Sequence, residues 1–125
     1  MFQDLEVFRT AMALARHSGH SQALSARNMA NSDTPDYHSK YLEDFTEVLR
    51  SEVGGMRATR PEHLHGDNDL AAAERIERDA PQDPNGNTVS LEREMLRAVD
   101  AQRKHQRALT IYRSNLSVLR ASLGR

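Results

Sequence analysis

A line of mostly apolar or small residues runs through the first thirty positions at alternating intervals of three and four. It comprises Leu5, Phe8, Met12, Ala15, Gly19, Gln22, Ala26 and Met29. This is the heptad a/d spacing of a helix that packs along another helix. The segment holds no proline and is rich in alanine, a strong helix former. The pattern predicts one long helix from Phe2 to Ala30. We call its line of a/d positions the seam, and the side chains at the centre of this seam are small.

The last third of the chain repeats this spacing. Its seam comprises Leu91, Met95, Ala98, Gln102, His105, Leu109, Tyr112, Leu116, Leu119 and Leu123. Ser90 is expected to cap the start, so that Glu92 and Glu94 lie in the first turn, where the helix dipole favours acids. Gly124 is expected to end the helix. The spacing therefore predicts a second long helix from Ser90 to Leu123.

The segment between the two helices contains one short periodic stretch. Tyr37, Tyr41, Phe45 and Leu49 recur every four residues, which predicts a helix from Ser39 to Glu52 with these side chains on one face. Two interpretations of this stripe stay open: it covers a long helix, or it contacts another subunit. Residues 53–87 are interrupted by glycine and proline and predict an exposed, partly disordered loop, with at most a short helix near Leu70 to Glu77.

These elements predict an all-α chain whose long N- and C-terminal helices pack as a coiled coil. The expected organisation is a coiled-coil helix (1–31), a turn and short helix (32–52), a flexible loop (53–87) and a second coiled-coil helix (88–125). Only 38% of the 125 residues are apolar, and there is no Trp or Cys. A two-helix hairpin with so thin a core is marginal alone, so we expect a subunit of an assembly.

Charge is unevenly spread along the chain. Residues 1–50 carry a net charge of -2, residues 51–87 carry -4 and residues 88–125 carry +5. The basic C-terminal stretch is interpreted as a solvated helix face; the alternative, a nucleic-acid binder, predicts salt-sensitive binding to DNA. No apolar run approaches the roughly 18 residues of a membrane span, and the acidic start is unlike a Sec signal peptide.

Candidate chemistry is sparse. His17 with His20, and His63 with His65, could each supply two metal ligands, but a usual zinc site needs three or four. We therefore expect solvated histidines, no metal site and no cofactor. No nucleophile–base–acid set is found, so no catalytic residue is assigned and the chain is not expected to be an enzyme.

The helix stop after Ala30 carries a recognisable motif. Pro35 cannot continue a helix and holds Thr34 in extended backbone. The matching residues Asn28, Ala30, Asn31, Thr34, Pro35 and Tyr37 resemble the Asn-Ile-Ala-Asn-x-x-Thr-Pro-Gly-Tyr signature shared by bacterial flagellar rod and hook proteins. Asp36 replaces the usual glycine, which predicts an altered or strained turn at that position.

A second segment strengthens this resemblance. Residues 85–95 are similar to the Gly-Asn-x-Val-x-Leu-Glu-x-Glu-Met pattern that opens the C-terminal helix of the most proximal member of the flagellar rod family. Asp44-Phe45 also looks like a short motif that follows the signature in that member. The first motif alone would fit the related rod proteins FlgC and FlgF equally well.

The resemblance implies a structural subunit of the proximal rod, which polymerises into the hollow drive shaft that transmits motor torque. It implies as partners other copies of the chain, FlgC, FlgF, FlgG, the adaptor FliE and the type III export gate, with no nucleic acid and no membrane insertion. The implied location is the periplasmic rod, reached without a Sec signal. The turn from Asn31 to Tyr37 and the aromatic stripe would bridge neighbouring subunits. An FlgC-like rod protein or a non-polymerising helical adaptor are the alternatives.

Overall fold

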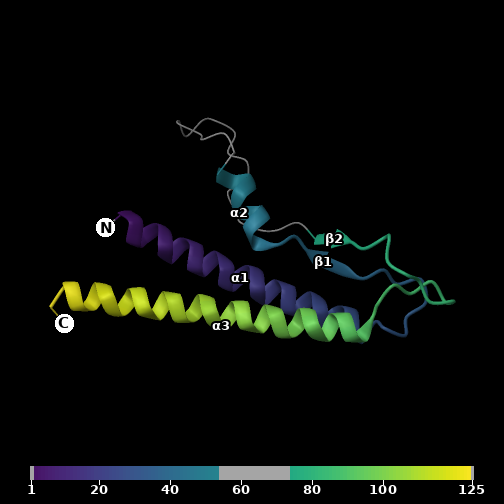
Figure 1. Ribbon diagram of the computed structural model, residues 1–125. Helices are drawn as coiled ribbons and strands as arrows, with labels where there is room; N and C mark the ends of the chain where they lie inside the picture. Colours follow the sequence, from purple (N-terminus) through teal and green to yellow (C-terminus); the bar gives the residue numbers. More distant parts are fainter. Residues whose placement is uncertain (1, 54–73, 125) are drawn as a thin grey trace.

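The computed structural model describes residues 2–53 and 74–124. Its elements in chain order are α1 (Phe2–Ala30), β1 (Lys40–Leu42), α2 (Phe45–Val53), β2 (Glu74–Ile76) and α3 (Leu91–Ser122). The helices α1 and α3 lie side by side and antiparallel, with both chain termini at the same end (Figure 1). The prediction of a mainly helical chain with two long packed helices is confirmed.

Small residues dominate the buried positions of the two long helices. They are Ala11, Ala13, Ala15, Ser18 and Ser25 on α1 and Ala101 and Ala108 on α3. Toward the termini, the rings of Phe8 and Tyr112 pack edge to face with centroids 5.1 Å apart. Small side chains let two helix backbones approach closely but bury little apolar area, so each pair adds little stability.

The predicted seam of α3 is only partly buried within the single chain. Glu94, Ala101 and Ala108 are buried, each one residue before a predicted seam position, whereas Met95 is 59% exposed. Gln102 is also exposed. The predicted positions that do lie half-buried are Ala98, His105, Leu109, Tyr112, Leu116 and Leu119. The physical reason is that alanine, rather than the larger residue beside it, fits where the two backbones come close.

The predicted seam of α1 shows the same division. Phe8, Gly19 and Met29 are half-buried and Ala15 is buried, but Leu5 is 55% and Met12 is 42% exposed. Gln22 and Ala26 are exposed as well. Four of the eight predicted seam positions of α1 are therefore exposed in the single chain.

The middle of the chain departs most from prediction. The helix expected from Ser39 begins only at Phe45, because Lys40–Leu42 forms β1 and pairs antiparallel with β2, Lys40 opposite Ile76. Tyr37 and Tyr41 therefore do not share a helical face with Phe45. The short helix expected near Leu70 to Glu77 is also wrong where residues 74–76 form a strand; the rest of that prediction lies outside the described residues.

The ends of α3 are only partly as predicted. Ser90 occupies the N-cap position with extended backbone, but its hydroxyl donates to Glu92 Oε2 (3.1 Å) and makes no capping bond. Gly124 follows the helix with φ +70°, and the Leu123 N–H donates to the Leu119 carbonyl, as expected for a glycine-ended helix. Among the described helices, none is long and apolar enough to cross a bilayer.

Candidate functional site

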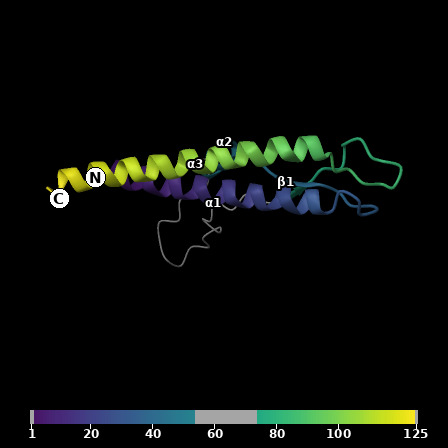
Figure 2. The same cartoon turned by 90° about the horizontal axis from the view of Figure 1, so that it is seen from below.

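The two motif segments, some fifty residues apart in sequence, lie together at the end of the molecule opposite the termini (Figures 1 and 2). We call residues 31–39 and 77–90 the tip loops. The Asp36 N–H donates to the Asn85 carbonyl (3.0 Å), and the Thr88 N–H donates to the Tyr37 carbonyl (3.1 Å). The first motif is therefore held in place by the second.

Asn28 is the anchor between α1 and β1. Its side chain is fully buried. The amide Nδ2 donates to the Lys40 carbonyl (2.7 Å), and Oδ1 accepts from the Lys40 N–H (3.1 Å) and the Tyr37 hydroxyl (3.2 Å). One side chain thus satisfies both backbone polar groups of a strand residue, which explains why β1 forms where the periodicity predicted helix.

Asn87 likewise satisfies backbone polar groups, here in the turn that follows α1. Its Nδ2 donates to the carbonyls of Asn31 (2.9 Å) and Thr34 (2.8 Å), and its Oδ1 accepts from the Val89 N–H (2.7 Å). The neighbouring Thr88 Oγ1 accepts from the Ser39 N–H (2.9 Å). The sequence did not predict the contacts with Asn31, Thr34 and Ser39, because these partners lie about fifty residues away.

The substituted position of the signature adopts the backbone that glycine would take. Asp36 has φ +56°, the one positive φ of a non-glycine residue in the described part of the chain. Left-handed backbone is less favourable for aspartate than for glycine. Asn31 and Thr34 join across the turn, Thr34 Oγ1 donating to Asn31 Oδ1 (3.2 Å). Pro35 is exposed on the turn and Ala30 ends α1.

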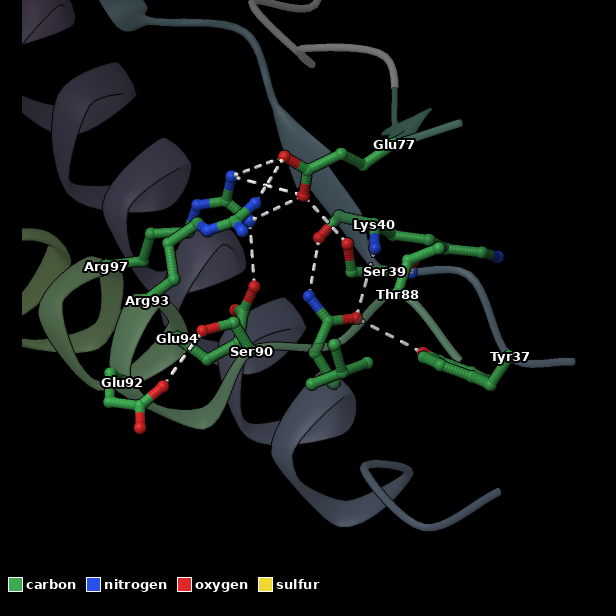
Figure 3. Close-up of polar contacts among 12 residues, drawn as sticks. Tyr37, Ser39, Lys40, Glu77, Thr88, Ser90, Glu92, Arg93, Glu94 and Arg97 are labelled. Atoms are coloured by element: carbon green, nitrogen blue, oxygen red, sulfur yellow. Dashed lines mark hydrogen bonds and ion pairs between the residues drawn. The ribbon is translucent and has the colours of Figure 1, made fainter. Parts of the chain in front are cut away.

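A charged cluster ties the tip loops to the start of α3 (Figure 3). Glu77 accepts hydrogen bonds from the Ser39 hydroxyl (2.8 Å), Arg93 (3.0 Å) and Arg97 (3.3 Å). Burial raises the pKa of Glu77, but the bonds from Ser39 and Arg97 outweigh it, and the pKa lies below its ordinary value. The carboxylate is therefore ionised at neutral pH and works as a fixed acceptor.

Arg97 is the centre of this cluster. Besides Glu77 it donates to Glu94 Oε1 (2.7 Å), and its guanidinium lies 5.7 Å from the centroid of the Tyr41 ring. Burial opposes its charge, but Glu77 and Glu94 raise the pKa of Arg97 above its ordinary value. Glu94 is 1% exposed, so Arg97 pairs with a buried carboxylate of its own helix while it contacts Tyr41 of β1 and Glu77, which follows β2.

His17 is buried, so the prediction of a solvated histidine is wrong there. Its Nε2 lies 2.8 Å from the Glu43 carbonyl, and its ring packs edge to face on Phe45, 5.5 Å between centroids. Burial lowers the pKa of His17. His20 is exposed beside Glu74, and His63 and His65 lie outside the described residues. Within residues 2–53 and 74–124 no three ligand-type side chains cluster to hold a metal.

Lys104 fixes the start of α2 against α3. Its Nζ lies 3.0 Å from Asp44 Oδ1, and this bond is the main cause of a lowered pKa for Asp44. Behind the pair, a cavity of about 240 Å³ between α1, β1 and α3 is lined by charged and polar side chains that include His17 and Arg97. Asp44 and Lys104 pair with each other on its wall, whereas Lys40, Glu43 and Arg97 pair with residues outside the lining.

The residues predicted to contact neighbouring subunits fall into two groups. Tyr37, Tyr41 and Phe45 make the contacts within the chain described above, and Leu49 is half-buried on α2. By contrast, apolar seam side chains stand exposed along both long helices: Leu5, Met12, Leu91, Met95 and Leu123, with Leu96, Val99 and Val118 beside them. The single chain leaves these side chains in contact with water.

Comparison with known proteins gives the chain its family. No protein-family model matches it. It is 29% identical over 120 residues to the flagellar basal body rod protein FlgB of Agrobacterium fabrum, covering 90% of this chain and 88% of the relative. It is 30% identical over 105 residues to FlgB of Salmonella typhimurium, covering 76% of each. With both motif segments joined in one tip, the chain belongs to the FlgB family of flagellar basal body rod proteins.

Proposed function

We propose that the chain is a structural subunit of the proximal rod, polymerising into the drive shaft that carries motor torque to hook and filament. The observation that supports this most directly is the row of exposed apolar side chains on α1 and α3, with Met95 59% and Leu123 76% exposed. Neighbouring helices would bury them. Contacts between unlike surfaces that do not close into a ring give an open helical polymer.

The proposed partners are other copies of the chain, the rod proteins FlgC, FlgF and FlgG, the adaptor FliE and the export gate. The proposed site of action is the periplasmic part of the basal body, reached through the flagellar export apparatus without a Sec signal. Torque would be resisted by packed helices, so the function requires no catalytic group. The small residues buried between α1 and α3 support this route, because a thin core unfolds at little cost.

Deletion of the gene and purification of basal bodies test this function. We expect non-swimming cells, restored by the wild-type gene, and a wild-type chain that co-purifies with the rod. A chain that is absent from basal bodies and stays monomeric with every rod component would overturn the proposal. Binding to basal bodies in a single copy would instead identify the non-polymerising adaptor.

A further inference from the structure

Charge is separated along the long axis of the molecule. We call residues 5–16 of α1 and residues 104–124 at the end of the chain the stem. It begins where His105 Nδ1 lies 3.0 Å from the Ala15 carbonyl oxygen and runs from there toward the termini. The stem carries six Lys and Arg residues and one acid, Glu6. The tip loops at the opposite end carry five acids and one base, Arg78. Stem and tip loops therefore have opposite net charge.

The stem charges have little compensation within the chain. Lys104 is bound to Asp44. The five remaining bases, all exposed, form no ion pair with any residue that the structure describes; they are Arg9, Arg16, Arg107, Arg113 and Arg120. At 1.5 Å per residue, Arg107 lies about 24 Å and Arg120 about 44 Å along α3 from Leu91, the first residue of this helix. Both distances exceed the Debye length of about 8 Å at physiological salt.

The tip loops carry the acidic charges that complement the basic stem. Glu77 is held by Arg93 and Arg97. The other four acids, Asp33, Asp36, Asp79 and Asp83, are exposed and have no ion pair among residues 2–53 and 74–124. A groove of about 450 Å³ opens between these loops and the start of α3, with Asp33, Asp83 and Glu92 on its wall. Its carboxylates suit guanidinium groups, which bind them in forked pairs.

We propose that the acidic tip loops of one copy bind the arginine-bearing stem of a second copy, so that copies join head to tail. Within residues 2–53 and 74–124, the stem and tip charges are too far apart to neutralise one another, so a second copy is the partner that satisfies both ends. Such a contact joins unlike surfaces and leaves one stem and one tip open for further copies. The inference rests on the proposed rod function and adds the polarity and chemistry of the contact.

Charge reversal tests the contact in cells that lack the gene. The stem variant carries Arg107→Glu, Arg113→Glu and Arg120→Glu; the tip variant carries Asp33→Lys, Asp79→Lys and Asp83→Lys. Each variant then has like charges at both ends, so we expect each alone to lose swimming and rod assembly. Co-expression pairs the acidic stem with the basic tip, and the basic stem with the acidic tip, so swimming should return. A chain carrying both sets should assemble by itself.

The controls separate this inference from the proposed function. The exposed Arg27 lies outside stem and tip loops, and Arg27→Glu should assemble like the wild type. If cells swim with the stem variant alone or with the tip variant alone, the head-to-tail contact is overturned. It is also overturned if neither co-expression of the two variants nor the chain carrying both sets of substitutions restores swimming, while the wild type still builds rods. A stem variant that swims but no longer binds DNA would assign the basic stem to nucleic acid and likewise overturn it. If the wild-type chain never enters basal bodies, the rod function falls first.

Discussion

The side chain of Asp36 lies directly against the α-carbon of Gly86, and both residues adopt left-handed backbone, with φ +56° and +81°. A Cβ at Gly86 would come within 3.0 Å of Asp36 Oδ1. Asp36 stands where the rod signature has glycine, and Gly86 belongs to the second motif. The two motifs therefore meet at a point where a side chain on Gly86 would displace that of Asp36.

Gly86→Ala is expected to destabilise the fold by about 1–2 kcal/mol, because alanine at positive φ is strained and its methyl group meets Asp36. Removing the aspartate side chain in Asp36→Gly should recover part of that cost, with a coupling of about 0.5 kcal/mol or more. Urea unfolding of the two single variants and the double variant measures this coupling. Gly19→Ala is the matched control, since its Cβ meets nothing within 4 Å on a helix, and it should stabilise. Full additivity would contradict the contact.

Asn28→Ala should cost about 3 kcal/mol, because it leaves the N–H and carbonyl of Lys40 and the hydroxyl of Tyr37 without their partner in a buried site. Asn31→Ala is the comparison. The Asn31 amide donates to the Arg27 carbonyl of its own helix, in an exposed place, so its loss should cost less than about 1 kcal/mol. Equal losses in the urea midpoints of the two variants would show that Asn28 is not the anchor of β1.

His17 should make stability depend on pH in a mildly acidic range. Its pKa is lowered by burial from 6.5, so below that value the unfolded chain binds more protons than the folded one. The free energy of unfolding therefore falls as pH drops below 6.5, and it is regained as pH rises to neutrality. Carboxyl groups act in a lower range, from ordinary values of 4.5 and below. Urea unfolding from pH 5 to 8 should show this slope in the wild type and in His20→Gln, and a weaker slope in His17→Gln.

Ala101→Leu tests which face of α3 meets α1. Ala101 is 3% exposed, so a leucine there should overpack the interface and cost about 1–3 kcal/mol. Gln102→Leu places the same side chain one position later, on an exposed site, and should leave the thermal midpoint nearly unchanged. If Gln102→Leu lowered the thermal midpoint more than Ala101→Leu, the face predicted from the heptad would be the one that meets α1.

The sequence predicts the long helices because their signal is local. Both ranges follow from spacing, alanine content and the glycine after Leu123, all properties of neighbouring residues. The heptad spacing selects Gln102 and Leu109 on α3, whereas the chain buries their neighbours Ala101 and Ala108, because close backbone packing selects the smaller residue.

The middle segment could not be predicted from spacing at all. Tyr37, Tyr41 and Phe45 recur at helical intervals, yet Asn28 holds the Lys40 peptide and β2 pairs with it from more than thirty residues away. Those partners are fixed by tertiary structure. The contacts of the signature residues within the chain follow from Asn87 and Thr88, whose partners lie about fifty residues away in sequence.

The contact between Ala15 and His105 spans 90 residues of sequence. A chain made from its N-terminus therefore carries α1 without its partner until residue 105 has been synthesised. Closing so long a loop costs conformational entropy before any contact repays it, which slows folding. Helices in proteins gain most of their stability from tertiary packing, so α1 lacks its main support until α3 has formed. The time during which the newly made chain can be recognised in an open state is thus set by where along the sequence its pairing residues lie.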